Sequence, residues 1–161
     1  MPPRLPQPKR SVLERSIEID VPADRLFRFH LDTRNAPRVS PRSQEFLSIE
    51  GRFPVQEGDV VEVKVRQAPI PVAQLWRVKV EAVVPNRALV DVALDSPFAE
   101  WRHEHRFEPI DRDRTRLTDR VTYRLPGGPL GPVIDRILVR RMLEKTFEAR
   151  QRNTKTLLEA R

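Results

Sequence analysis

The sequence predicts an α+β domain in which one antiparallel sheet packs against a long C-terminal helix. Six short segments between residues 44 and 125 have strand patterns, and only turns separate them, which is typical of antiparallel pairing. Residues 133–161 contain no proline or glycine, as expected of a continuous helix. A chain of 161 residues is also long enough to form one domain with one sizeable core.

The N-terminal part is predicted to contribute a strand and a short helix. Ser16–Val21 alternates polar and apolar residues, so we expect a strand there. Pro22 follows, and because proline favours the start of a helix, a short helix is predicted over Ala23–Leu31. Residues 32–43 contain asparagine, prolines and serines, which predict a turn or a single helical turn.

The remaining strands are recognised by alternation between apolar and charged residues. In one of them Trp76 and Val78 alternate with Arg77 and Lys79, so one face is apolar and the other is charged. The predicted strands are Gln44–Glu50, Asp59–Arg66, Gln74–Val84, Ala88–Leu94, Trp101–Pro109 and Thr115–Leu125.

The C-terminal helix is predicted to begin at Val133, after a loop over residues 125–132 that is rich in proline and glycine. Its apolar residues form two stripes on nearly opposite sides of the helix, at about 100° per residue. One stripe comprises Val133, Ile134, Ile137 and Leu138, and the other comprises Val139, Leu143, Phe147, Thr154 and Leu157. The helix therefore bends near residues 140–142, or its two halves face different neighbours. A second stripe also offers a surface for a homodimer.

Composition and charge argue against several classes of protein. Without cysteine there is no disulfide, thiolate metal site or cysteine nucleophile. The apolar runs are too short to cross a bilayer, so no transmembrane segment is expected. The lack of cysteine fits a cytoplasmic protein, which is the location we expect. The net charge of +7 is concentrated in the N-terminal tail and the C-terminal helix, a pattern that gives weak support for nucleic-acid binding, so no such partner is expected. Residues 1–11 are predicted to be a disordered basic tail, and residues 12–161 a single domain.

The stretch WRHEHRF, residues 101–107, places two of the three histidines between aromatic residues. If its strand forms a hairpin with Thr115–Leu125, one register places opposite charges across from each other, and each such pair contributes about 0.2–1 kcal/mol. Those outer pairs are Glu104 with Arg120 and Glu108 with Arg116. The inner face of this register pairs Trp101 with Tyr123, His103 with Val121, His105 with Asp119 and Phe107 with Leu117. A slip by one residue would turn this apolar set outward.

Three roles are open to His103, His105 and Asp119 on this inner wall. A metal site would use them together with His30, but alternate residues of a strand lie about 6.5–7 Å apart, and no other histidine or cysteine is available. We therefore predict no metal and no cofactor. An acid–base pair of His105 and Asp119 would suit aldol-type cyclisation or dehydration. The third role is a hydrogen-bonded polar point in the wall of a pocket.

Four motifs accompany this order of elements: Ser96-Pro97-Phe98, Trp101-x-His103-x-His105-x-Phe107, Thr115-x-Leu117-x-Asp119-x-Val121-x-Tyr123 and Pro126-Gly127-Gly128. Together they resemble the START-like, or SRPBCC, superfamily, and within it the polyketide cyclase/dehydrase-type, ligand-binding group. The resemblance implies a helix-grip fold, in which a curved seven-stranded antiparallel sheet wraps the C-terminal helix and two short helices follow the first strand. It also implies a cavity for hydrophobic or amphipathic ligands. It carries over no set of catalytic residues.

We therefore expect a protein that binds a small hydrophobic or aromatic ligand, lipid- or polyketide-like, in an internal cavity. The alternative is a cyclase or dehydratase of polyketide-like substrates that uses His105 and Asp119 for acid–base chemistry. The residues predicted to line the cavity are Trp76, Trp101, His103, His105, Phe107, Asp119, Tyr123 and Phe147.

Overall fold

The computed structural model describes residues 9–127, 133 and 135–160. In this part of the chain seven strands form one antiparallel sheet in the order β1-β7-β6-β5-β4-β3-β2. The strands are β1 (Ser11–Ile19), β2 (Gln44–Glu50), β3 (Val60–Gln67), β4 (Gln74–Val84), β5 (Ala88–Asp95), β6 (Glu100–Pro109) and β7 (Thr115–Arg124). The helices are α1 (Ala23–His30), a 3-10 turn (Thr33–Asn35), α2 (Ala36–Val39) and α4 (Arg140–Glu159).

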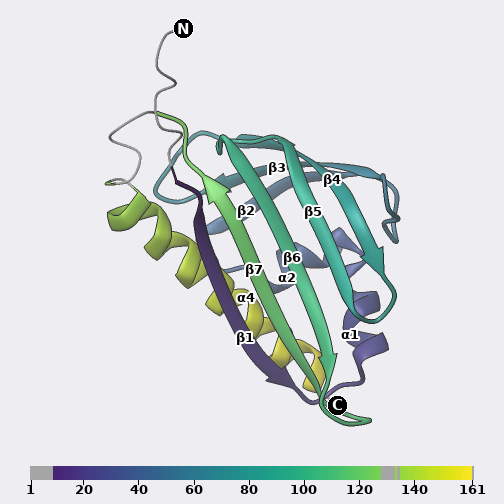
Figure 1. Cartoon of the computed structure of the whole chain (residues 1–161). Coiled ribbons are helices and arrows are strands. Elements are labelled where there is room, and N and C mark those ends of the chain that lie inside the picture. The colour runs from purple at the N-terminus through teal and green to yellow at the C-terminus, as the bar shows by residue number, and fades with distance from the viewer. Residues whose placement is uncertain (1–8, 128–132, 134, 161) are drawn as a thin grey trace, which may run out of the picture.

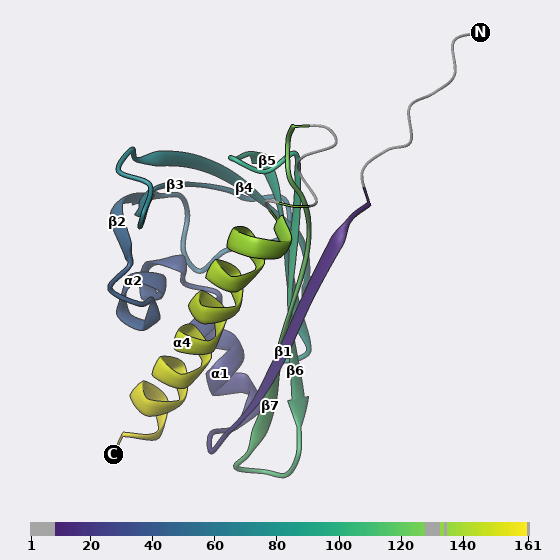
Figure 2. The same cartoon turned by 90° about the vertical axis from the view of Figure 1, so that its left-hand side faces the viewer.

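The sheet is curved around α4, as Figure 1 and Figure 2 show. In Figure 2, β2 and β3 pass over one side of the helix, while β1, β6 and β7 lie on the other. Irregular register within the β2–β3 and β4–β5 pairs contributes to this curvature, because bulges bend strands and increase their twist. Helix α4 packs against β1 and α2. The α+β class and the helix-grip fold are thus confirmed.

The predicted register of the β6–β7 hairpin is confirmed throughout, from Trp101 opposite Tyr123 to Phe107 opposite Leu117. The ion pairs on its outer face follow the prediction only in part. Glu108 and Arg116 approach to 3.7 Å. Arg120, however, contacts Glu14 of β1 at 3.1 Å instead of pairing with Glu104. The reason is that β7 lies between two strands, and β1 also presents a glutamate directly opposite Arg120.

Strand β1 begins earlier than the sequence pattern indicates. It pairs with β7 from Ser11 opposite Tyr123 to Ile19 opposite Thr115. Val12 points outward, which breaks the alternation that locates a strand in the sequence. The ordered domain therefore includes Ser11, and the Arg10 side chain contacts Glu100 of β6. Residues 1–8 of the predicted tail lie outside the described residues.

The C-terminal helix changes from π-helical to α-helical geometry at Arg140, close to the bend predicted near residues 140–142. A π-helical segment, Asp135–Val139, leads directly into α4 at Arg140. Because a π-helical turn contains an extra residue, it alters which side chains face the sheet. Ile137 and Leu138 of the first stripe are more than half exposed. Of the second stripe, Leu143, Phe147 and Thr154 are buried along α4, whereas Val139 and Leu157 are only partly buried. Leu158, which was not in the predicted stripe, is buried instead of Leu157. Ile134 lies outside the described residues.

The core consists of two clusters of buried apolar side chains. One includes Phe27 of α1 with Phe107 and Leu117 of the hairpin. The other includes Tyr123 of β7 and Phe147 of α4. Among the helices of the described residues, none is long and apolar enough to cross a membrane.

Phe107 is completely buried, and its ring meets Phe27 edge to face at a centroid distance of 5.5 Å. We predict that Phe107→Ala lowers the free energy of unfolding by about 3–5 kcal/mol, because the surrounding side chains cannot close the cavity that it leaves. Urea unfolding followed by circular dichroism measures this loss. Ile110→Ala, in the exposed turn after β6, is the control. A loss below about 1 kcal/mol for Phe107→Ala would show that this ring is not a core residue.

Candidate functional site

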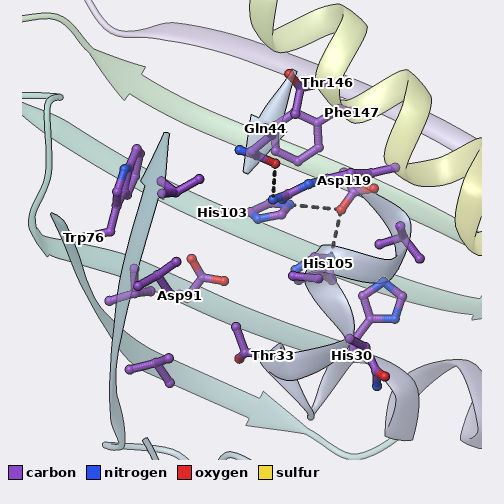
Figure 3. A pocket seen from close by; sticks show the side chains of 18 of the residues that line it. His30, Thr33, Gln44, Trp76, Asp91, His103, His105, Asp119, Thr146 and Phe147 are labelled. Atoms are coloured by element: carbon purple, nitrogen blue, oxygen red, sulfur yellow. Dashed lines mark hydrogen bonds and ion pairs between the residues drawn. The ribbon is translucent and has the colours of Figure 1, made fainter. Parts of the chain in front are cut away.

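A pocket of about 260 Å³ lies between the concave face of the sheet and α4. Its floor and sides are apolar over β3 and β4, where Val61, Val63 and Val65 point inward. Polar side chains from β5, β6, β7 and α4 gather on the opposite wall, shown in Figure 3. Because each strand supplies alternate residues to one face, the inward positions of β3 to β7 converge on this space.

Six of the eight side chains predicted to face a cavity line this pocket. They are Trp76 of β4, Trp101, His103 and His105 of β6, Asp119 of β7 and Phe147 of α4. Trp76 and Trp101 meet edge to face at 5.1 Å, and Phe147 stacks on Trp101 at 6.5 Å. The structure thus brings the aromatic and polar residues to one place. Their contact with a ligand stays a prediction.

The prediction that Phe107 and Tyr123 line the cavity differs from the structure. Both side chains face inward, but neither borders the pocket. Both are completely buried. Helix α1 covers Phe107 through Phe27, and Phe98 packs on Tyr123 at a centroid distance of 5.7 Å. Inward orientation follows from the strand period, whereas the packing of α1 and of the β5–β6 connection covers these two rings.

The Asp119 carboxylate is the centre of the polar wall. Its Oδ1 accepts a hydrogen bond from Nε2 of His103 at 2.9 Å. Nδ1 of His105 lies 2.8 Å from the same oxygen, but without the alignment of a hydrogen bond. Oδ2 accepts from Nε2 of Gln151 on α4 at 2.7 Å. The predicted partner, His105, is therefore adjacent, but the bonded histidine is His103, the diagonal neighbour across the hairpin.

These contacts set the charge of each group. Burial alone would raise the pKa of Asp119, but the hydrogen bond from His103 and the approach of His105 outweigh it and hold that pKa well below its usual range. The pKa of His105 is lowered, first by burial and then by the neighbouring His103. The site at neutral pH is accordingly a buried carboxylate with a neutral His105 beside it.

His30 of α1 adds a third imidazole to this wall. Its ring centroid lies 4.9 Å from that of His105. Its Nδ1 donates to the backbone carbonyl of Leu26 at 2.8 Å, so Nε2 carries a lone pair. Burial, followed by the nearby His105, lowers the pKa of His30 to about 3. His30 is therefore also neutral at physiological pH.

Sequence reasoning missed three charged residues of the pocket: Asp32, which pairs with Arg34, Asp91 of β5 and Arg150 of α4. The last two face the polar wall. Asp91 lies directly opposite His103 in the sheet, and burial raises its pKa to about 6. Part of its side chain remains open to the pocket. Two signals could have found these residues: Asp91 occupies an inward position of a predicted strand, and Arg150 follows Phe147 by three residues, on the same side of the helix.

A metal ion would find one candidate set among the described residues: Asp91, His103 and His105. Their ligand atoms lie within 4.8 Å of one another. Ligands of a tetrahedral zinc ion with bonds of about 2.1 Å are roughly 3.4 Å apart, so these side chains would have to move to bind one. In this candidate set the carboxylate ligand is Asp91, whereas the sequence pattern suggested Asp119. The absence of a resident metal stays a prediction.

The curved sheet, the long helix and the pocket between them define a helix-grip protein. The chain belongs to the polyketide cyclase/dehydrase and lipid transport family, whose model matches residues 10–159. This confirms the resemblance seen in the sequence. A search of curated proteins gave no match.

Solved structures of known proteins share the fold. The protein TTHA0849 from Thermus thermophilus is 18% identical, with 94% of this chain and 100% of that chain covered and a TM-score of 0.73. The Zhui aromatase/cyclase from Streptomyces sp. R1128 is 20% identical, with 94% of each chain covered and a TM-score of 0.75. Norcoclaurine synthase from Thalictrum flavum is 13% identical, with 95% of this chain and 89% of that chain covered and a TM-score of 0.69. At these identities the likeness concerns the fold.

The raised pKa of Asp91 predicts a pH-dependent difference between the wild type and Asp91→Asn. Between pH 4 and about 6 the folded carboxyl binds more protons than the unfolded one, so its contribution to stability falls as the pH rises. Asparagine has no such dependence. Relative to the wild type, Asp91→Asn should therefore gain up to about 2–3 kcal/mol between pH 4 and pH 7.

Urea unfolding at both pH values measures this difference. Asp95→Asn, at the exposed end of the same strand, is the matched control. A difference between Asp91→Asn and the wild type that is equal at pH 4 and pH 7 would show that Asp91 titrates normally.

Proposed function

We propose that this protein binds a small hydrophobic or aromatic molecule, lipid- or polyketide-like, in the pocket between the sheet and α4. One observation carries the proposal: an apolar, aromatic-lined pocket remains open beside a small set of convergent polar groups. Ligand sites of proteins typically combine a mostly apolar lining with a few polar groups that fix orientation. Membership of a family described by polyketide cyclisation and lipid transport supports the same class of ligand.

The size of the pocket favours a compact ligand. Its volume of about 260 Å³ lies just below the range of about 300–1,000 Å³ that is typical of small-molecule sites. A fused-ring molecule suits this space better than a two-chain lipid. Nε1 of Trp76 is buried without a hydrogen-bond partner among the described residues, so it is available to an oxygen of the ligand.

The alternative function is a cyclase or dehydratase of polyketide-like substrates, and the arrangement of Asp119, His105 and Asp91 favours it. With Nδ1 of His105 against Asp119, the Nε2 lone pair is free to remove a proton next to a substrate carbonyl. Asp119 would stabilise the resulting imidazolium. A protonated Asp91 would give its proton to the departing hydroxyl, which leaves as water while the new double bond forms.

A molecule should accompany the protein when it is purified from its own host. Native mass spectrometry should then show an excess mass that is lost under denaturing conditions. Trp76→Phe combined with Phe147→Ala, which opens the aromatic wall, should reduce the bound fraction by at least about tenfold, because each aromatic contact contributes about 0.5–1.5 kcal/mol beyond its buried area. Leu75→Ala, on the outer face of β4, is the control. An unliganded protein that also fails to bind any of a panel of fused-ring aromatics would rule out the binding function.

The substitution His105→Gln distinguishes the proposed binding function from the enzymatic alternative. If the protein is a dehydratase, this variant should lower turnover of a polyketide-like β-hydroxy ketone by roughly 100-fold or more while its affinity for the substrate changes little, because the general base is lost and the shape is kept. Asp119→Asn should act in the same direction. Thr122→Ala, at an outward position of the same strand as Asp119, is the control. Measurable binding without turnover by the wild type would contradict the enzymatic alternative.

A further inference from the structure

Arg150 is held in the wall of the pocket by neutral groups only. Its Nε donates to Oγ of Ser40 at 3.1 Å, and its Nη2 donates to Oε1 of Gln44 at 2.9 Å. Gln44 and Phe147 both line the pocket, and Figure 3 labels them. Two hydrogen bonds to neutral oxygens fix the direction of the guanidinium but place no negative charge in direct contact with it.

Arg150 is partly buried, and no carboxylate of the described residues lies within 4.0 Å of its guanidinium, although charged groups withdrawn from water are normally paired. The nearest acidic groups act on it only at longer range, and its burial lowers the pKa of the guanidinium. The Nη1 group also has no hydrogen-bond partner in the described part of the chain. Such a cation is costly to bury when the pocket is empty, and an anion would offset that cost.

Aromatic rings extend from Arg150 along the pocket. The guanidinium carbon lies 5.8 Å above the ring of Phe147 and 6.0 Å from that of Phe46. Phe147 in turn stacks on Trp101, and Trp101 meets Trp76. A flat molecule along these rings would therefore have one end at the guanidinium and its body against aromatic side chains.

Three carboxyls line the pocket and restrict where an anion can bind. Asp32 is paired with Arg34. The Asp119 oxygens are already engaged by His103 and Gln151. Asp91 lies on β5, away from α4, as Figure 3 shows. An anionic group is therefore favoured at Arg150 and disfavoured beside Asp91.

We propose that the ligand of this pocket carries an acidic oxygen, a carboxylate or a phenolate, and that Arg150 binds it. This inference rests on the proposed binding function and adds the chemical class of the ligand. The aromatic body of the ligand lies against Phe147, Trp101 and Trp76, and its anionic end is at α4. An uncharged lipid or hydrocarbon lacks the group that Arg150 is placed to bind.

The test uses two probes of nearly equal shape, 2-naphthoate and its neutral amide, 2-naphthamide. The chain contains two tryptophans, and both line the pocket, so intrinsic fluorescence reports binding directly. The wild type should bind the carboxylate at least about tenfold more tightly than the amide. Arg150→Gln should abolish that difference, chiefly by weakening the carboxylate. Arg152→Gln, on the exposed side of α4, should leave it unchanged.

Thermal unfolding of the unliganded variants distinguishes ligand binding from a structural role. Removing a partly buried charge that has no carboxylate in direct contact should leave the melting temperature of Arg150→Gln equal to or above that of the wild type. A lower melting temperature together with equal losses for both probes would overturn the inference.

Two further results would also overturn it. Equal affinity of the wild type for the two probes would reject the acidic oxygen but leave pocket binding intact. If neither probe binds, the inference fails, and the mass-spectrometric experiment on protein from the native host decides the broader binding function separately.

Discussion

A buried carboxylate that must be satisfied organises this molecule. Asp119 faces the interior because the β6–β7 register places it on the apolar side of the hairpin. An unpaired buried charge would be strongly destabilising, so its two oxygens need donors. His103 of β6 supplies one, and Gln151 supplies the other from α4. The same interaction therefore connects the sheet to the long helix and places imidazoles and a carboxylate on one wall of the pocket.

Burial pushes most of the other titratable groups of the pocket toward their neutral forms. It raises the pKa of Asp91 and lowers those of His30 and His105. Asp119 and Asp32 are exceptions, because direct donors lower their pKa values in spite of desolvation. Arg150 also keeps its charge, since a guanidinium loses its proton only far above physiological pH. The pocket wall thus holds an anion, Asp119, whose oxygens have direct donors, and a cation, Arg150, that has no carboxylate in direct contact. A well-packed apolar core would not need this arrangement.

Particular residues show which features of the fold and of the site could be predicted from the sequence. Opposite charges at Glu108 and Arg116 and the apolar alternation of β6 and β7 gave the correct hairpin register, and with it the inward direction of both histidines. The ion pair expected for Arg120 was wrong because β1 supplied a competing glutamate from more than a hundred residues away. The early start of β1 was missed for a related reason: pairing with β7 determines its length, and an outward Val12 hides that in the sequence.

The sequence by itself determined which side chains face inward, because strand period and cross-strand charge depend on local order. The tertiary structure alone decided which inward side chains border a pocket and which are packed. Phe107 is covered by α1, whereas Trp101 remains open toward α4, although both lie on the inner face of the same strand. The tertiary structure also decided that Asp91 and Arg150 line the same pocket as the histidines. Their convergence depends on the curvature of the sheet and the placement of the helix, which arise from packing between residues far apart in the chain.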